Sequence, residues 1–154
     1  MKKSFDALDI RIVNALRDDA TIGYEELSRK VKAPPTTLYQ RIKKMKENEA
    51  IRKIVPLINH EYFNYNLTVF LLIGVSDIKE IERIGKELSK FDEVMESHHI
   101  TGTNNILVKI KIRDNSEYRQ FLSEKVGAIK GIRDVHDFVT LNTFKEEPSV
   151  RLKI

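Results

Sequence analysis

The sequence predicts an α+β chain of two domains, a small helical domain followed by a larger sandwich in which strands and helices alternate as β-α-β-β-α-β. Apolar residues recur at helical spacing through the first part of the chain. From Leu67 onward, an apolar run and strict alternation predict strands instead. We expect the helical domain over 1–52, a β-strand and hinge linker over 53–65, and the second domain over 66–154.

The first domain is expected to hold three helices and one short strand. The first helix spans 6–18, where Asp6 can cap the N-terminus, and the second ends near Val31. The third begins at about Pro35, because proline fits the first turn of a helix but breaks its interior. The β-branched residues within 51–57 predict a short strand, or β-wing. Three helices and a wing are typical of a winged helix-turn-helix domain.

The second domain is expected to be a ferredoxin-like βαββαβ sandwich. Its clearest strand signal lies at 105–113, where apolar and basic residues alternate. Both helices of such a sandwich pack on one face of the sheet, so the other apolar face needs a partner, and a second copy of the chain is the simplest one. The predicted strands are 67–75, 93–101, 105–113 and 132–144, and the predicted helices are 77–88 and 116–126.

Composition separates the two halves of the chain. The net charge is +4, with +5 carried by residues 1–60 and −1 by residues 61–154. A basic front segment attracts polyanions, although abundant Lys and Glu are also typical of thermophiles. The chain has no cysteine, which excludes disulfides, thiolate zinc sites and a cysteine nucleophile. No apolar run approaches the roughly 20 residues that span a bilayer, so we expect a soluble, cytoplasmic protein without a membrane partner.

The third helix carries the strongest functional signal. Residues 34–46 hold four basic residues and no acidic one, while Leu38, Ile42 and Met45 form a buried stripe. The second helix of a helix-turn-helix motif enters the DNA major groove, so double-stranded DNA is the expected partner. A solvated lysine face is the alternative for an isolated helix, but the two preceding helices favour DNA. The expected DNA-binding residues are Thr36, Thr37, Tyr39, Gln40, Arg41, Lys43 and Lys44.

These side chains suit different contacts with a duplex. Thr36 and Thr37 offer short hydroxyls to phosphate, or a methyl contact to thymine, and Gln40 can bond adenine through both atoms of its amide. The basic residues supply phosphate contacts or read guanine.

Longer segments extend this interpretation to the whole chain. The first half contains ALDIRIVNALRDDATIGYEELSRKV, PPTT and RIKKMKENEAI, and the second half contains HHITGTNNILVKI and KGIRDV. Together they resemble the Lrp/AsnC (feast/famine) family of transcription regulators. The resemblance implies a homodimer joined through its C-terminal sheets, often assembled into a tetramer or octamer, whose paired recognition helices read pseudo-palindromic operators. It also implies an amino acid or related small molecule as effector, bound at a loop formed by Thr101, Gly102, Thr103, Asn104 and Asn105.

Three residues depart from the family's pattern. Lys32 and Glu49 stand where the family usually has glycine, so both turns must be closed by residues that tolerate them less well. Asn105 stands where the sensor loop usually has Asp, three residues after Gly102. Because an amide replaces a charge there, this protein is expected to bind a different effector or none.

No catalytic, metal or cofactor site is predicted. His98 and His99 are adjacent on a strand and point to opposite faces, so they cannot chelate one ion together; His60 and His136 are isolated. The sequence has no GxGxxG motif and no P-loop, and its adjacent carboxylates lie on solvated stretches that suit no acid/base work. We therefore expect a DNA-binding regulator. A ligand-independent architectural DNA-binding protein of the same fold is the alternative, and an enzyme subunit lacks any catalytic constellation.

Overall fold

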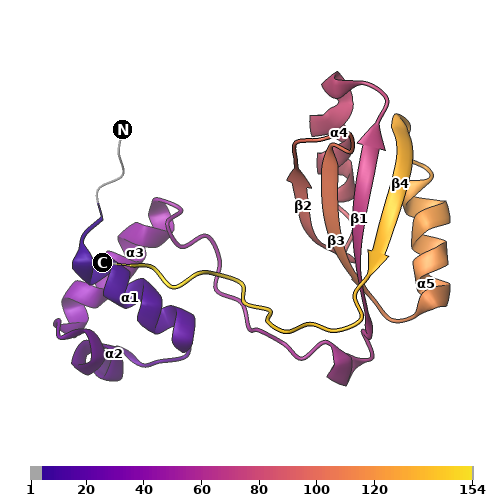
Figure 1. Ribbon diagram of the computed structural model, residues 1–154. Helices are drawn as coiled ribbons and strands as arrows, with labels where there is room; N and C mark the ends of the chain where they lie inside the picture. The colour runs from indigo at the N-terminus through magenta and orange to yellow at the C-terminus, as the bar shows by residue number, and fades with distance from the viewer. Residues whose placement is uncertain (1–4, 154) are drawn as a thin grey trace. The chain divides into compact units, whose positions relative to one another are not determined.

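The computed structural model describes residues 5–153 and divides into two compact units (Figure 1). The N-terminal unit contains the described residues up to Leu57 together with those from Lys145 onward, and the second unit is Ile58–Phe144. The sequence predicts 66–154 as one domain, whereas in the structure the last residues pack with the N-terminal unit. Apolar and basic residues alternate over 150–153, a pattern that indicates an extended segment but does not indicate which part of the chain it contacts.

Three helices form the N-terminal unit, as predicted: α1 (Ala7–Asp18), α2 (Tyr24–Val31) and α3 (Pro35–Glu47). Asp6 caps α1 by accepting hydrogen bonds from the backbone N–H groups of Leu8 and Asp9, and the Asp9 carboxylate accepts one from the N–H of Asp6. This reciprocal arrangement is a capping box. The buried residues that join the three helices are Ile12, Ala15, Leu27, Val31, Leu38, Ile42 and Met45.

Two turns of this unit have left-handed backbone, which glycine adopts most easily. Lys32 ends α2 with φ 56°, and Glu49 follows α3 with φ 57°. A Cβ atom is strained in this conformation. The two positions where the sequence lacks the expected glycine are therefore the positions where a glycine would relieve strain.

The predicted strand at 51–57 is wrong for this chain, because residues 52–57 form no strand in the part that the structure describes. A strand needs a neighbour for its backbone hydrogen bonds, and no described strand pairs with this segment. Pro56 also lacks an N–H to donate. Ile54, Val55 and Leu57 consequently remain 46%, 50% and 63% exposed.

The second unit has the predicted order β-α-β-β-α-β and is an antiparallel sheet with strand order β2-β3-β1-β4 (Figure 1). After the 3₁₀ turn Ile78–Glu80 the chain continues directly into α4, and α5 continues into the π-helical turn Phe121–Val126. The elements are β1 (Leu67–Val75), α4 (Ile81–Leu88), β2 (Val94–His99), β3 (Ile106–Ile112), α5 (Asn115–Gln120) and β4 (Ile132–Val139).

The last strand is shorter than predicted. β4 ends at Val139, which pairs with Val69 of β1, and the N–H of Thr140 donates the final bond to the carbonyl of Thr68. Because β1 begins at Leu67, which lies opposite position 141 in this register, residues beyond Leu141 have no strand beside them. The strand predicted over 132–144 is therefore longer than the part of β1 with which it can pair.

The core of this unit lies on one face of the sheet. Alternate residues of β1 and β3, such as Leu71 and Val108, are fully buried against α4 and against Phe121. No helix of the unit Ile58–Phe144 covers the opposite face: Phe138 of β4 lies directly opposite Phe70 of β1 and is 55% exposed. No helix among the described residues is long and apolar enough to cross a membrane.

Candidate nucleic-acid interface and effector loop

The face of α3 that points away from the core carries the residues expected to bind DNA. Leu38, Ile42 and Met45 are buried, as predicted. The remaining face is polar and cationic and has no acidic residue in its first turn, so the positive end of the helix dipole is not neutralised there. Thr36, Tyr39, Gln40, Lys43 and Lys44 are exposed and Thr37 is half-buried.

One aromatic contact and one ion pair involve residues of this face, and both leave it exposed to solvent. The ring of Tyr39 lies 6.1 Å from the ring of Tyr24, which starts α2. Tyr39 is thereby placed at the junction of the two helices while 56% of it stays exposed. Lys43 is 4.0 Å from Glu47, and both side chains are 63% exposed, so this pair restrains Lys43 only weakly.

Arg41 is the member of the predicted set that the structure turns toward the protein. Its Nη1 donates to Asp6 at 2.6 Å and to Asp9 at 3.0 Å. The pKa of Asp6 is lowered, first by the hydrogen bond from the N–H of Asp9 and then by Arg41, and the two carboxylates raise the pKa of Arg41. The guanidinium thus connects α3 to the capping box of α1, a role that the sequence analysis missed.

The predicted effector loop turns at a glycine that is required there. Gly102 has φ +121°, which L side chains rarely adopt. Asn105 closes the loop with its backbone, donating from its N–H to the carbonyl of Ile73 and accepting from the N–H of Ile100. Its side-chain nitrogen lies 3.4 Å from the carbonyl of Gly102, to which it donates. A carboxylate at this position could not donate that bond, so the amide of Asn105 has a structural use.

The five loop residues divide between two sides. Thr101, Gly102 and Asn105 line a hollow of about 460 Å³ together with Ile78, Ile81, His99 and Ile100. Asn104 instead donates to Asp134 on β4 at 2.6 Å, and Arg133 donates to the carbonyl of Thr103 at 3.1 Å. The structure therefore brings three of the five predicted residues together at one hollow, while the other two attach the loop to β4.

Arg133 and Asp134 were missed because they read as ordinary charged positions of a strand. The hydrogen bond from Arg133 is the main cause of the lowered pKa of Asp134. Their side chains cross over Gly74, where a Cβ atom would lie 2.5 Å from Nη2 of Arg133 and 2.5 Å from Oδ1 of Asp134. A glycine inside an otherwise apolar strand is the one signal that would have indicated this close approach.

The adjacent histidines His98 and His99 have different neighbours. His98 lies 3.2 Å from Glu96, and its neighbour His99 faces the hollow beside the loop. Within residues 5–153 no cluster of three or more His, Asp or Glu side chains is arranged to hold a metal ion.

Comparisons with known proteins match both units. The model of the AsnC-type helix-turn-helix domain matches residues 5–46, and that of the Lrp/AsnC ligand binding domain matches residues 68–150. The HTH-type transcriptional regulator FL11 of Pyrococcus abyssi is 33% identical over 99% of this chain and 100% of its own length. The leucine-responsive regulatory protein of Escherichia coli is 28% identical over 98% of this chain and 93% of its own.

The fold agrees with these matches. The structure of a transcriptional regulator of Neisseria meningitidis in complex with L-Met superimposes with a TM-score of 0.87 at 22% identity, covering 96% of both chains. With its helix-turn-helix unit and its four-stranded ligand-binding-type unit, the chain belongs to the Lrp/AsnC family and is a DNA-binding transcriptional regulator.

Proposed function

We propose that this regulator binds a pseudo-palindromic operator as a homodimer, or as a tetramer or octamer built from dimers, and that an amino acid or related small molecule controls it. The observation that carries the proposal is the exposed cationic face of α3, with Gln40 and Lys44 outward and no acidic residue in its first turn. The second helix of such a motif places its N-terminal residues against base edges in the major groove.

Each exposed side chain has a proposed part in reading DNA. Gln40 is the proposed base reader, because a side-chain amide forms two hydrogen bonds with adenine. Lys43 and Lys44 are the proposed phosphate contacts, and Thr36 and Thr37 stand at the end of α3 that enters the groove. Arg41 is proposed to position α3 through Asp6 and Asp9 rather than to contact phosphate.

The uncovered face of the sheet supports the proposed dimer. Phe70, Leu72 and Leu107 lie on that face beside the exposed Phe138, and two basic residues of β3, Lys109 and Lys111, share it. Apolar area that a sheet leaves toward water is stabilised when a second layer covers it. An identical face on a second copy supplies that layer and also joins two copies of α3 in one assembly.

The hollow beside the loop supports a small, uncharged recognition site. Ile78, Ile81 and Ile100 give it an apolar wall, while Thr101 and Asn105 supply polar groups. No Asp, Glu, Lys or Arg is among the residues lining it. The ammonium and carboxylate of an amino acid would be met there by hydroxyl, amide and backbone groups and by the imidazole of His99, which fits the use of Asn rather than Asp at position 105.

The test of DNA reading is selection of bound duplexes from a randomised pool. Sequence-specific reading predicts recovery of paired half-sites whose centres lie about one turn, roughly 34 Å, or a multiple of it apart. Equal binding to all sequences, with only a steep salt dependence, would instead support the architectural alternative.

The test of the effector is thermal unfolding of the purified protein with each of the twenty amino acids. A ligand that prefers the folded protein raises the unfolding temperature in proportion to the logarithm of its concentration. The related regulator of Neisseria meningitidis was solved with L-Met, and the Escherichia coli relative is named for its response to leucine, so these two amino acids are tested first. Twenty flat profiles would refute the amino-acid part of the proposal.

A further inference from the structure

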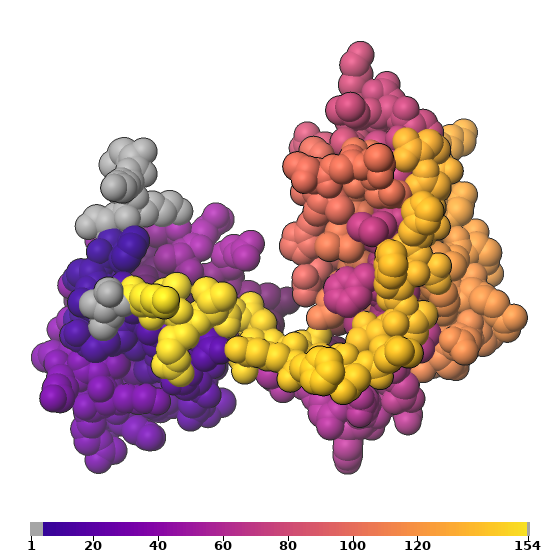
Figure 2. Space-filling view, viewed as in Figure 1, coloured from indigo at the N-terminus to yellow at the C-terminus, as the bar shows by residue number. Residues whose placement is uncertain are grey.

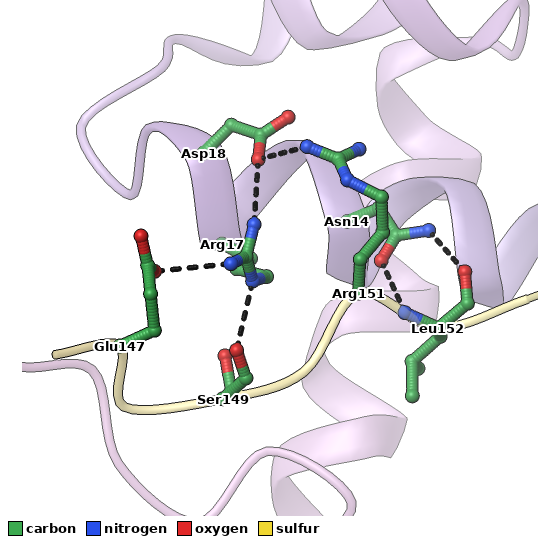
Figure 3. A network of polar contacts seen from close by, with 7 residues as sticks. All are labelled: Asn14, Arg17, Asp18, Glu147, Ser149, Arg151 and Leu152. Carbon is green, nitrogen blue, oxygen red and sulfur yellow. Dashed lines mark hydrogen bonds and ion pairs between the residues drawn. The ribbon is translucent and has the colours of Figure 1, made fainter. Parts of the chain in front are cut away.

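The outer face of α1 is occupied by the end of the chain. Asn14, Arg17 and Asp18 lie three and four positions apart on α1, so their side chains share one face of the helix. All three contact residues 145–153, which we call the C-terminal strap (Figure 3). Figure 2 shows the end of the chain, in yellow, lying across the surface of the N-terminal unit.

Asn14 recognises the backbone of the strap rather than a side chain. Its Nδ2 donates to the carbonyl of Leu152 at 2.9 Å, and its Oδ1 accepts from the N–H of Leu152 at 2.9 Å. One amide therefore satisfies both polar groups of an extended residue, as a neighbouring strand would. This pairing is independent of the sequence of the strap and depends on its conformation.

Three further contacts are ionic or involve an ionic donor. Arg17 donates from Nε to the carbonyl of Ser149 at 3.0 Å and from Nη2 to Glu147 at 3.0 Å. Arg151 donates to Asp18 at 2.6 Å, and this bond is the main cause of the lowered pKa of Asp18. The side chains of Glu147 and Arg151 are 43% and 59% exposed, while those of their partners Arg17 and Asp18 are 16% and 33% exposed. Ion pairs with one solvent-exposed partner contribute little individually and are weakened by salt, which favours reversible docking.

The chain that joins β4 to the docked strap is the shorter of two covalent connections between the units. Eight residues lead from Val139, the end of β4, to Glu147, and at roughly 3.5 Å per residue they reach at most about 28 Å. Sixteen residues lead from Ile51, which packs against the helical core, to Leu67, the start of β1, and reach at most about 56 Å. A docked strap therefore limits the separation of the units to about half of what the other connection allows.

The end of the strap comes close to the recognition helix. Leu152 lines a hollow of about 750 Å³ between α1 and α3, to which Gln40 and Lys44 also contribute. At its other end the strap is joined through residues 140–144 to β4, whose Asp134 accepts a hydrogen bond from Asn104 of the effector loop. One continuous segment thus runs from the strand that anchors the loop to the flank of the helix that faces DNA.

We infer that the face of α1 formed by Asn14, Arg17 and Asp18 is a docking surface for the C-terminal strap of the same chain, and that this docking is reversible and sets the reach of the DNA-binding unit. With the strap docked, two copies of α3 are held within a narrow range of separations. With the strap detached, the same two helices reach a wider range of half-site spacings at lower effective concentration. The second part of this inference rests on the proposed operator binding, and the first part does not.

Docking is tested without DNA. The N–H of Leu152 is expected to exchange with solvent more slowly in the unaltered protein than in Asn14→Ala, which removes both amide bonds and keeps a good helix former in α1. Val150→Ala is the matched control, because Val150 lies in the strap and its side chain is 77% exposed. Exchange of Leu152 at the rate of an unfolded peptide in the unaltered protein would overturn the docking.

The inference requires that the strap and the face of α1 that it contacts belong to the same chain. The sequence has no cysteine, so Asn14→Cys with Leu152→Cys introduces a single pair of thiols. Mild oxidation is expected to consume both thiols while the protein still runs as a single chain on a non-reducing gel. A disulfide-linked dimer would mean that the strap belongs to a second copy, and thiols that stay free would mean that it does not dock; either result contradicts the inference.

The effect on DNA is measured with the operator recovered by selection, with the same operator lengthened by five base pairs, and with a single half-site. Two variants are compared with the unaltered protein: Asn14→Ala, and a variant that ends at Phe144. Both are expected to bind the selected operator roughly tenfold more weakly and the single half-site with unchanged affinity. The difference in affinity between the selected and the lengthened operator is expected to be smaller in both variants than in the unaltered protein. Equal losses on all three duplexes would overturn the reach-setting role. If the unaltered protein binds no sequence preferentially, the proposed operator binding fails, while the exchange and thiol experiments still judge the docking.

Discussion

Arg41 of the recognition helix α3 donates a hydrogen bond to Asp6, the N-cap of α1, across 2.6 Å. The same carboxylate accepts the N–H groups of Leu8 and Asp9 at the start of α1. The side chain of Asp6 therefore caps α1 and also binds Arg41 of α3, so the orientation of α3 depends on the cap of α1. This relationship separates Arg41 from the exposed lysines that follow it.

We expect Arg41→Lys to behave like Arg41→Ala. Arg41 bonds two carboxylates through one planar guanidinium, a geometry that the point charge of lysine does not reproduce. Both variants should lower the unfolding temperature and weaken operator binding, with the slope of log affinity against log salt unchanged because no phosphate contact is lost. Melting curves and salt-dependent gel shifts measure this. Lys46→Ala, at another exposed basic residue of α3, is the control, and full rescue by lysine would instead indicate a phosphate contact.

Acid should weaken the start of α1. The pKa of Asp6 in the folded protein lies below its ordinary value of 3.8, so its ionised form stabilises the fold at pH values above 3.8, and this contribution disappears as the pH falls through the lowered value. Asp6→Asn keeps a capping side chain but loses the charge. Amide exchange in α1 should be faster in Asp6→Asn than in the unaltered protein at pH 6, and the difference should shrink below about pH 4. A difference independent of pH would contradict this account.

Gln40 and Lys43 should affect DNA binding in different ways. Gln40→Ala is expected to cost roughly 1–3 kcal/mol on the best operator and to relax base preference at one position. Lys43→Ala should weaken binding on all sequences and reduce the salt slope by about one. Titrations of both variants against the selected operator and a scrambled duplex separate the two roles. Matching losses on both duplexes for both variants would refute this division.

Asn105→Asp should loosen the effector loop rather than improve it. The side chain of Asn105 donates to the carbonyl of Gly102, and a carboxylate there would face that carbonyl without a hydrogen. We expect a lower unfolding temperature and a changed order of response to the twenty amino acids. Thr103→Ser is the control, because the carbonyl of Thr103, which both residues have, accepts the bond from Arg133. An unchanged melt and an unchanged ligand order would contradict the role given to the amide.

Glycine at the end of α2 should stabilise the protein. Lys32 holds φ 56°, and the relief of this strain outweighs the extra entropy that glycine gains in the unfolded chain, leaving roughly 0.5–1 kcal/mol. Lys32→Ala keeps the Cβ atom and should change little. Urea unfolding of both variants measures the difference, and Glu49→Gly repeats the experiment at an independent turn. A loss of stability in both glycine variants would show that the unfolded-state entropy dominates.

Truncation tests whether the second unit joins the copies. A fragment that ends at Asn59 lacks the uncovered sheet, so it should remain a monomer and bind the operator poorly, because two linked half-site contacts become separate ones. Sedimentation and gel shifts measure this. Full operator affinity in a monomeric fragment would overturn the proposed role of the sheet.

Elements that depend on neighbouring residues along the chain could be predicted from the amino-acid sequence alone. The apolar spacing on α3 placed Leu38, Ile42 and Met45 inward and so left Gln40 and the lysines exposed, and the alternation of β3 fixed which residues face the core. Proline and Asp6 marked where α3 and α1 begin. These features follow from the period of a helix or strand and from capping, which depend only on neighbours along the chain.

Contacts between segments far apart in the sequence became known only from the three-dimensional fold. β4 ends near the end of its partner β1, and residues 52–57 form no strand because no strand lies beside them. Arg41 pairs with Asp6 rather than lying on the exposed face of α3. The fold also brings Asn14 to Leu152, more than a hundred positions away. A hydrogen bond or ion pair of this kind requires two segments to arrive together, and a polar side chain gives no sign in the sequence of which distant partner it will find.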